Sequence, residues 1–239
     1  MRLLKIIVIM ALFTSLVYAV KQIVPIKHVK IDGTFEHISK DELKAALEPL
    51  VDVGFFDADL QAIHDVLAQM IWVENVTVNR VWSDTLKIKI LEKHPIVRWG
   101  DDSLLSSRGE IIKPTEIEPF ENLPILRGIE GQELKSLEIM KGVNTALADQ
   151  EMSMAEFSIN NRWAWKIRLT TGLEILLGRN EQLKKLQRFM KTLDVLGHEQ
   201  INAMAVVDLR YPNGYAVSWK ANVQPVNWNN LPAAQAANR

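Results

Sequence analysis

The sequence contains no cysteine in its 239 residues, and this absence excludes disulfide bonds, thiolate catalysis and zinc sites built on cysteine. The net charge is only −1 at pH 7, so the charge balance gives no reason to expect nucleic acid as a partner. The other residue types occur at frequencies that are ordinary for a globular protein. A chain of this length predicts two domains in addition to any targeting segment.

The sequence also lacks the motifs of common catalytic and metal sites. Its five histidines are far apart, with no His-x-His or His-Glu-x-x-His spacing, so we interpret each as a surface residue. It has no Gly-x-Ser-x-Gly, Walker or Gly-x-Gly-x-x-Gly motif. Asp57 with Asp59, and Asp101 with Asp102, are neighbouring carboxylates, but their positions favour turns and helix caps. We therefore predict no catalytic, metal-binding or cofactor-binding residue and no small-molecule substrate.

An apolar run occupies the N-terminus of the chain. Residues from Ile6 to Val20 are uncharged, and with the apolar residues on both sides the run reaches roughly 20 residues, enough to cross the hydrocarbon core. We predict a short cytoplasmic tail and one transmembrane helix within residues 1–24, with the rest of the chain outside the inner membrane. The alternative is a cleaved signal peptide, because Val17-Tyr18-Ala19 has small enough residues for cleavage.

Residues 25–94 have the pattern of a small α+β domain with its helices on one face of the sheet. Ser39-Lys40-Asp41-Glu42 is a capping box, and Leu86, Ile88 and Ile90 alternate with polar residues. The predicted elements are a strand over Ile26–Asp32, a helix from Ser39 that Pro49 ends, a helix from Asp57 or Asp59 to about Met70, and strands over Val73–Trp82 and Leu86–Glu92.

Residues 95–220 predict a second α+β domain, built on an antiparallel sheet. Short turns separate most of its strands, and residues 114–124 are expected to form a loop. The predicted elements are strands at Ile96–Trp99 and Ile111-Ile112, a helix over Gln132–Leu147, strands over Met152–Ile159, Trp163–Leu169 and Leu173–Leu177, and a helix from Asn180, its expected cap, to Leu196. Residues 221–239 have no apolar period and predict a disordered tail.

The last structured stretch, Ile201 to Trp219, has the pattern of a β-hairpin with Pro212-Asn213-Gly214 at its turn. Its second arm, from Tyr215 to Trp219, is the last strand of the chain, so it is expected to leave one sheet edge unpaired. This arm has no lysine or proline before Lys220. Such an edge favours β-augmentation, in which a partner adds a strand.

Other aromatic and basic residues are open to two interpretations. Trp219 either packs in the core or contacts a partner, whereas tryptophans 72, 82, 99, 163 and 165 are interpreted as packing residues. The basic residues Lys184, Lys185, Arg188 and Lys191 are interpreted as a solvated helix face. Anionic lipid or nucleic acid is the alternative there, but no aromatic residues are interleaved with these charges.

Several motifs together resemble the FtsQ/DivIB family of bacterial cell-division proteins, which combine a POTRA domain with a β domain. Two stretches of the first domain are similar to family signatures. Ile71-Trp72-Val73 is similar to Pro-Trp-Val, with Ile71 in place of the proline. Arg80-Val81-Trp82-Ser83-Asp84-Thr85-Leu86 is similar to Arg-x-Trp-Pro-Asp-Thr-Leu, with Ser83 in place of the proline. Leu177-Gly178-Arg179, Arg188-Phe189 and the stretch from Val207 to Trp219 resemble the β domain in the same order.

The resemblance implies a non-catalytic divisome component that is anchored in the inner membrane by one helix, lies in the periplasm and gathers at the division septum. It implies FtsB, FtsL and other divisome proteins as partners. A chaperone-like POTRA component of an outer-membrane assembly or secretion system is the alternative, although such proteins carry several POTRA units and a long barrel. The motif and the predicted edge together give these candidate partner-binding residues: Arg179, Arg210, Tyr211, Asn213, Gly214, Tyr215, Ala216, Val217, Ser218 and Trp219.

Overall fold

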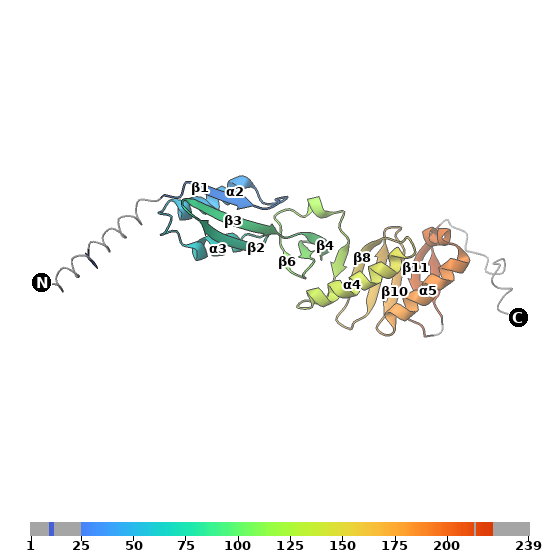
Figure 1. Cartoon of the computed structure of the whole chain (residues 1–239). Helices are drawn as coiled ribbons and strands as arrows, with labels where there is room; N and C mark the ends of the chain where they lie inside the picture. Colours follow the sequence, from blue (N-terminus) through green and yellow to red (C-terminus); the bar gives the residue numbers. More distant parts are fainter. Residues whose placement is uncertain (1–9, 12–24, 213, 222–239) are drawn as a thin grey trace. The chain divides into compact units, whose positions relative to one another are not determined.

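The computed structural model describes residues 10, 11, 25–212 and 214–221 (Figure 1). These residues fall into two compact units that divide between His94 and Pro95. Each unit has its own sheet and its own hydrophobic core. The architecture is α+β in both units, as the sequence predicts.

The expected membrane segment from Ile6 to Val20 lies outside the described residues, apart from Met10 and Ala11. In the part of the chain that the structure describes, no helix combines the length and the apolar character that a membrane crossing requires. Residues 222–239, most of the tail expected to be disordered, also lie outside the described part.

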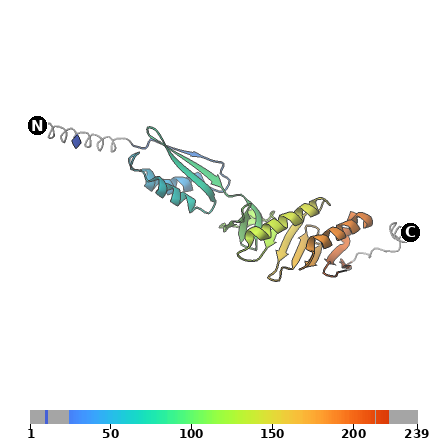
Figure 2. The same ribbon diagram turned by 60° about the horizontal axis from the view of Figure 1, so that its bottom comes forward.

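The first unit has the predicted order of strand, helix, helix, strand, strand. Its elements are β1 (His28–Asp32), α2 (Lys40–Val51), α3 (Leu60–Ala68), β2 (Val73–Val81) and β3 (Thr85–Glu92). Strand β3 lies in the centre of the sheet, parallel to β1 and antiparallel to β2. Figure 2 shows both helices on the same side of this sheet.

Alternation along β3 creates the core of the first unit. Leu86, Ile88 and Ile90 are at most 2% exposed, whereas the lysines between them face water. The buried residues of both helices cover this apolar face: Leu43 and Leu47 of α2, and Ile63 and Leu67 of α3. Burying one side chain of this kind contributes about 1.5–3 kcal/mol, so this face is the main source of the unit's stability.

Capping residues start both helices of the first unit. The Ser39 hydroxyl accepts a hydrogen bond from the Glu42 N–H at 3.0 Å, as the capping box predicts. The Asp59 carboxylate accepts from the N–H groups of Gln61 and Ala62, so Asp59 rather than Asp57 is the second cap. The prediction that Pro49 ends the first helix was wrong, because α2 continues to Val51. Proline at this position cannot donate to the carbonyl of Ala45 and crowds it, and the helix ends two residues later.

Two predictions about aromatic and histidine residues in this unit were also wrong. His37 is half-buried, its Nδ1 lies 2.8 Å from Glu92 Oε1, and its ring stacks on Trp72 with 4.1 Å between ring centroids. The Glu92 carboxylate, which is buried, also accepts hydrogen bonds from the N–H groups of Glu36 and His37. Trp82 is 75% exposed instead of packing in a core, because it lies beyond the last buried position of β2.

The second unit is a nine-stranded sheet in the order β12-β11-β10-β9-β8-β7-β4-β5-β6. Its elements are β4 (Pro95–Trp99), β5 (Ser103–Ser106), β6 (Ile111–Ile112), a 3-10 turn at Glu118–Phe120, β7 (Ile125–Arg127), α4 (Glu133–Ala148), β8 (Met154–Ile159), β9 (Trp165–Leu169), β10 (Glu174–Gly178), α5 (Gln182–Leu196), a 3-10 turn at His198–Ala203, β11 (Met204–Asp208) and β12 (Ala216–Trp219).

This sheet is mixed, which corrects the prediction of an antiparallel sheet. Strands β4 and β7, β7 and β8, and β10 and β11 pair in parallel. A parallel neighbour cannot be reached through a tight turn and needs a crossover. Helices α4 and α5 provide crossovers from β7 to β8 and from β10 to β11, and Figures 1 and 2 show both helices on the same face of the sheet.

One row of paired residues crosses the second sheet beneath these helices. It runs from strand to strand through Trp99, Leu126, Phe157, Ile167, Ile175, Val207 and Val217. The five inner members of the row are fully buried, and they belong to one core with the apolar residues of α4 and α5. The neighbouring row on the other face is mostly polar: Arg127, Ser158, Lys166 and Asp208 belong to it, with Leu176 between the last two. In the described part of the chain, the helices cover only the apolar face of the sheet.

Local details of the second unit differ from the prediction at two places. Strand β7 follows Pro124 directly and was not predicted, because three residues are too few to show an alternation. The residue before α5 is Glu181, in a left-handed conformation and without a side-chain cap bond, so the expected cap at Asn180 was wrong.

We expect Leu67→Ala to destabilise the first unit by roughly 2–5 kcal/mol, because Leu67 is fully buried and its truncation leaves a cavity. Val66→Ala is the matched control: Val66 precedes it on α3 but is 38% exposed, so its truncation should cost under about 0.5 kcal/mol. Equilibrium denaturation measures both free energies. Equal values for the two variants would contradict the core described here.

Candidate protein-interaction site

Strand β12 lies at the end of the second sheet. It pairs in an antiparallel manner with β11, with Asp208 opposite Ala216 and Val207 opposite Val217. Among the described residues, no strand pairs with its other side. The hairpin expected from the sequence is present, but its first arm ends at Asp208 and its second begins at Ala216, so the connection is longer than the expected Pro212-Asn213-Gly214 turn.

The direction of one backbone bond indicates which amide groups of β12 face the free side. The N–H of Lys220 donates to the carbonyl oxygen of Ala203 at 2.9 Å, toward the β11 side of the hairpin. Because backbone groups alternate along a strand, the N–H groups of Ser218 and Ala216 point the same way as that of Lys220. The N–H groups of Val217 and Trp219 therefore point to the free side, where an added strand could accept their hydrogen bonds.

The side chains of the edge divide between the core face and solvent. Tyr215, Val217 and Trp219 are half-buried and pack against the core, and the Tyr215 ring meets Phe189 of α5 edge-on, with 5.7 Å between centroids. Ala216 and Ser218 are exposed on the opposite face. Trp219 thus contributes to the core while part of its surface remains open at the edge. Tyr211 is 54% exposed and is the most accessible aromatic residue of this site.

Helix α5 holds the loop of the hairpin through two basic side chains. Lys185 is only 9% exposed, and its Nζ donates to the carbonyl oxygen of Arg210 at 3.2 Å. Arg188 Nη1 donates to the carbonyl oxygen of Pro212 at 3.1 Å. The interpretation of this basic group as a solvated face was therefore wrong for Lys185, whereas Arg188 is exposed and still contacts the loop. Their backbone acceptors lie about 25 positions away in the chain, a pairing that spacing on the helix cannot reveal.

Arg210 and Asp208 form a close ion pair at the start of the same loop. Arg210 Nε lies 2.8 Å from Asp208 Oδ1, and Nη2 lies 2.6 Å from Oδ2. This hydrogen bonding lowers the pKa of the Asp208 carboxyl below its ordinary value, against the opposing effect of burial. The pair therefore stabilises the folded state above the ordinary aspartate pKa, and this contribution falls away as the pH drops through the lowered pKa.

Gly178 places the end of β10, and with it the candidate residue Arg179, next to this ion pair. Its φ is +71°, and a Cβ added there would lie 3.2 Å from Arg210 Cγ, so the absence of a side chain lets Arg210 lie close to the end of β10. The exposed Arg179 follows directly. Arg179 and Arg210 thus lie in the same part of the sheet as the candidate residues between Tyr211 and Trp219. Of the candidate residues, Asn213 lies outside the described part of the chain.

Residues that sequence reasoning did not assign to this site support it from behind. Lys185, Arg188 and Phe189 position the loop, and Lys220 Nζ donates to the carbonyl oxygen of Thr171 at 2.8 Å, beside the end of β12. Phe189 falls on the apolar face of α5 and could have been found from helical spacing. The lysine contacts could not, because they end on backbone carbonyls.

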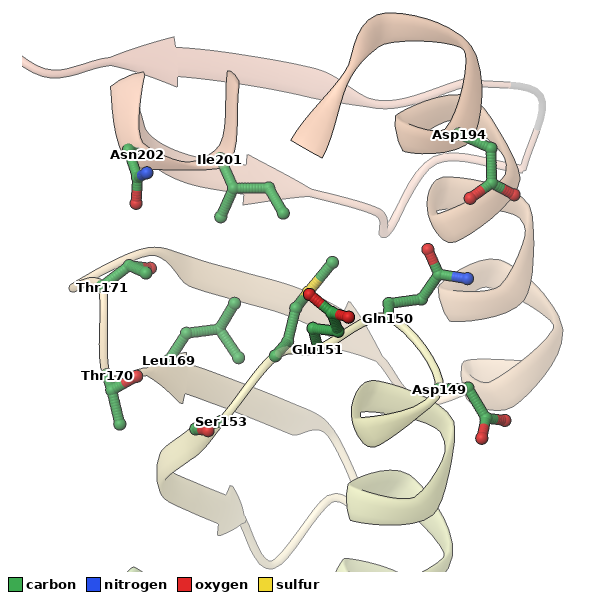
Figure 3. Close-up of a pocket in the computed structure, with 11 residues that line it drawn as sticks. Asp149, Gln150, Glu151, Ser153, Leu169, Thr170, Thr171, Asp194, Ile201 and Asn202 are labelled. Carbon is green, nitrogen blue, oxygen red and sulfur yellow. The ribbon is translucent and has the colours of Figure 1, made fainter. Parts of the chain in front are cut away.

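A separate cavity of about 630 Å³ lies where α4 ends, beside α5 and the 3-10 turn before β11 (Figure 3). Its polar lining includes Asp149, Glu151 and Asp194 together with the hydroxyl groups of Ser153 and Thr170. No histidine, lysine or arginine is among its lining residues in the described part of the chain, so its hydroxyl groups have no imidazole or amine base beside them. The described residues also contain no group of three or more side chains suited to a metal ion.

Comparison with known proteins gives matches to both units. Residues 24–93 match the POTRA domain of FtsQ type, and residues 97–210 match the family described as cell division protein FtsQ/DivIB, C-terminal. Cell division protein FtsQ of Methylomonas methanica is 51% identical over 204 residues, which cover 85% of this chain and 82% of that protein.

More distant relatives carry the same name. Cell division protein FtsQ of Cellvibrio japonicus is 32% identical over 195 residues, covering 82% of this chain and 61% of that protein. The FtsQ of a Thioalkalivibrio species is 31% identical over 198 residues, covering 83% and 82% respectively. The matches to both units, with identity over most of the chain, show that this chain belongs to the FtsQ/DivIB family of cell division proteins.

Proposed function

We propose that this chain is a non-catalytic scaffold of the division machinery, which binds FtsB, together with FtsL, through the free edge of β12. Membership of the FtsQ/DivIB family supports a role as a divisome component. The observation that carries the binding proposal is the position of β12, which lies at the end of the sheet with no strand on its outer side in the described residues. The family match ends at residue 210 and does not include β12, so the geometry of this strand is what supports it as the binding edge.

Addition of a partner strand would satisfy the backbone groups that face the free side of β12. The outward N–H groups of Val217 and Trp219 would donate hydrogen bonds to the added strand. These backbone bonds contribute binding affinity whatever the sequence of the partner. Selectivity would then come from side chains beside the strand: the exposed ring of Tyr211, the open part of Trp219, and the guanidinium groups of Arg179 and Arg210. An acidic side chain on the partner suits this pair of arginines.

The proposed scaffold has one membrane helix within residues 1–24 and both described units in the periplasm, concentrated at the septum. The apolar run from Ile6 to Val20 supports the anchor. The alternative, a chaperone-like component of an outer-membrane assembly or secretion system, is less well supported, because the POTRA match is to the FtsQ type.

The first prediction uses two substitutions at one position of β12. Val217→Pro removes the outward N–H, and an edge strand tolerates proline where its N–H faces solvent. Val217→Ala truncates the side chain but keeps the N–H. We expect Val217→Pro to weaken FtsB binding by roughly 1–3 kcal/mol more than Val217→Ala does, because a backbone donor is lost. Titration calorimetry with the full chain in detergent measures the difference.

Ser218→Pro is the control for the β11 side of the hairpin, since it removes an N–H that points toward β11. It should lower the thermal midpoint, whereas Val217→Pro should leave it close to that of Val217→Ala. If Val217→Pro and Val217→Ala bind FtsB equally well, the partner does not add a strand to β12.

The second prediction concerns the side chains beside the edge. Tyr211→Ala should weaken FtsB binding by roughly 1–3 kcal/mol with little change in thermal midpoint, because the Tyr211 ring is 54% exposed. Trp219→Ala should reduce both binding and stability, since Trp219 also packs on the core. Normal FtsB binding by Tyr211→Ala, measured by calorimetry, would remove Tyr211 from the interface.

The third prediction tests the topology. A reporter enzyme that is active only in the periplasm, fused after Arg239, should be active, and mass spectrometry of the mature protein should find Met1 or Arg2 at its N-terminus. Cleavage that leaves Val20 as the first residue would identify a signal peptide and contradict the anchor.

A further inference from the structure

An aromatic patch lies at the end of the first unit where β2 turns into β3. We call Val53, Phe56, Val81 and Trp82 the aromatic tip. The Trp82 ring is 5.9 Å from the Phe56 ring between centroids and 6.2 Å from that of the buried Phe55, yet Trp82 remains 75% exposed. Val53 and Val81 are each 44% exposed. Single exposed apolar residues are common, but here a largely exposed tryptophan lies against Phe56, next to Val81 in β2, and Val53 is on the same loop as Phe56. Such a grouping indicates a contact surface.

The chain enters the first unit beside this tip. Pro25 forms a β-bridge with Gly54, in the loop that carries Val53 and Phe56. The N–H of Lys27 donates to the carbonyl oxygen of Asp84 at 2.9 Å, in the turn that follows Trp82. Residues 25–27 therefore run next to both loops that form the tip.

The apolar run that ends at Val20 limits how far the tip can lie from a membrane. The chain from Val20 to Pro25 spans at most about 18 Å when fully extended. The headgroup layer on each side of a bilayer is about 5–8 Å thick. The aromatic tip is therefore within reach of the headgroup layer when the apolar run, with its flanking apolar residues within 1–24, crosses the hydrocarbon core.

We infer that the aromatic tip inserts into the headgroup layer of the same membrane that holds the anchor. This inference rests on the membrane anchor of the proposed function and adds a second, non-spanning contact. The amphipathic indole ring of Trp82 prefers the interface between lipid and water, where its N–H finds acceptors and its ring leaves bulk water. A second contact restricts the tilt of the first unit relative to the bilayer.

The charges around the tip favour a tethered contact rather than attraction to anionic lipid. Asp52 and Asp57 are exposed on the same loop as Phe56. Arg80 is engaged with the protein, because its guanidinium group donates to the carbonyl oxygens of Phe55 and Ala58. Lys27 pairs with Asp84 at 3.6 Å. The anchor instead holds the aromatic tip close to the membrane surface. A weak apolar contact can therefore form often enough without a basic patch to attract anionic lipid.

The absence of cysteine makes a direct test possible on the full chain. Ser83→Cys, beside Trp82, is labelled with a nitrobenzoxadiazole fluorophore and reconstituted into vesicles of phosphatidylethanolamine and phosphatidylglycerol. Leu91→Cys is the matched control: Leu91 is 46% exposed and lies about 20 Å along β3 from Thr85. We expect blue-shifted emission and strong quenching by nitroxide-headgroup lipid at position 83, and neither effect at position 91.

A third protein combines Ser83→Cys with Trp82→Ser and should lose the blue shift and most of the quenching. Its thermal midpoint should stay unchanged, because Trp82 is exposed. Vesicle flotation in alkaline carbonate reports the anchor separately. If the protein is retained but the labels at positions 83 and 91 behave alike, the inference is wrong while the anchor stands. Loss of retention would overturn the anchor and the inference together, and quenching that persists without Trp82 would overturn the role given to that residue.

Discussion

The second unit depends on the row of apolar side chains that crosses its sheet beneath α4 and α5. Each strand from β4 to β12, apart from the short pair at the far end, contributes one member of this row. The helices return over the same face to cover it, and this makes the β7–β8 and β10–β11 pairings parallel. The third parallel pairing, of β4 with β7, is reached through β5, β6 and the 3-10 turn at Glu118–Phe120. The row stays buried up to Val207 and is half-buried at Val217, so the core continues to the last strand.

This continuity explains how an edge strand of four residues can be ordered without a neighbour on its outer side. Tyr215, Val217 and Trp219 are attached to the core on one face, and α5 holds the preceding loop through backbone carbonyls. A partner that adds a strand would meet a template whose conformation is already restricted, so less conformational entropy is lost on binding. The same contacts mean that changes on α5, at Lys185 or Phe189, alter the edge without touching a partner.

Most elements could be predicted from local patterns because their physical causes are local. The alternation of Leu86, Ile88 and Ile90 predicts a half-buried strand, and Ser39 predicts a helix start, since each signal lies within a few residues. Strand pairing is not local. Nothing near Ile175 shows that Val207 becomes its parallel neighbour, and nothing near Lys185 indicates the carbonyl of Arg210. The edge position of β12 could be predicted because it is the last strand in chain order. Its attachment to α5 could not, and neither could the burial of His37 against Glu92, because both depend on contacts between residues distant in sequence.

Part of the strand order of the second sheet, from β7 to β12, also follows the order of synthesis, although β7 itself pairs with β4 rather than with β6. From β7 the sheet grows through β8, β9, β10 and β11 to β12, each strand next to the one made before it. Because chains are made from the N-terminus, each new strand can add to an edge that already exists, and the unit can assemble progressively as it emerges. Strand β12 is the last of these strands to be made, and no strand lies on its outer side among the described residues. A strand added by another protein would therefore take the position that the next strand in this order would occupy.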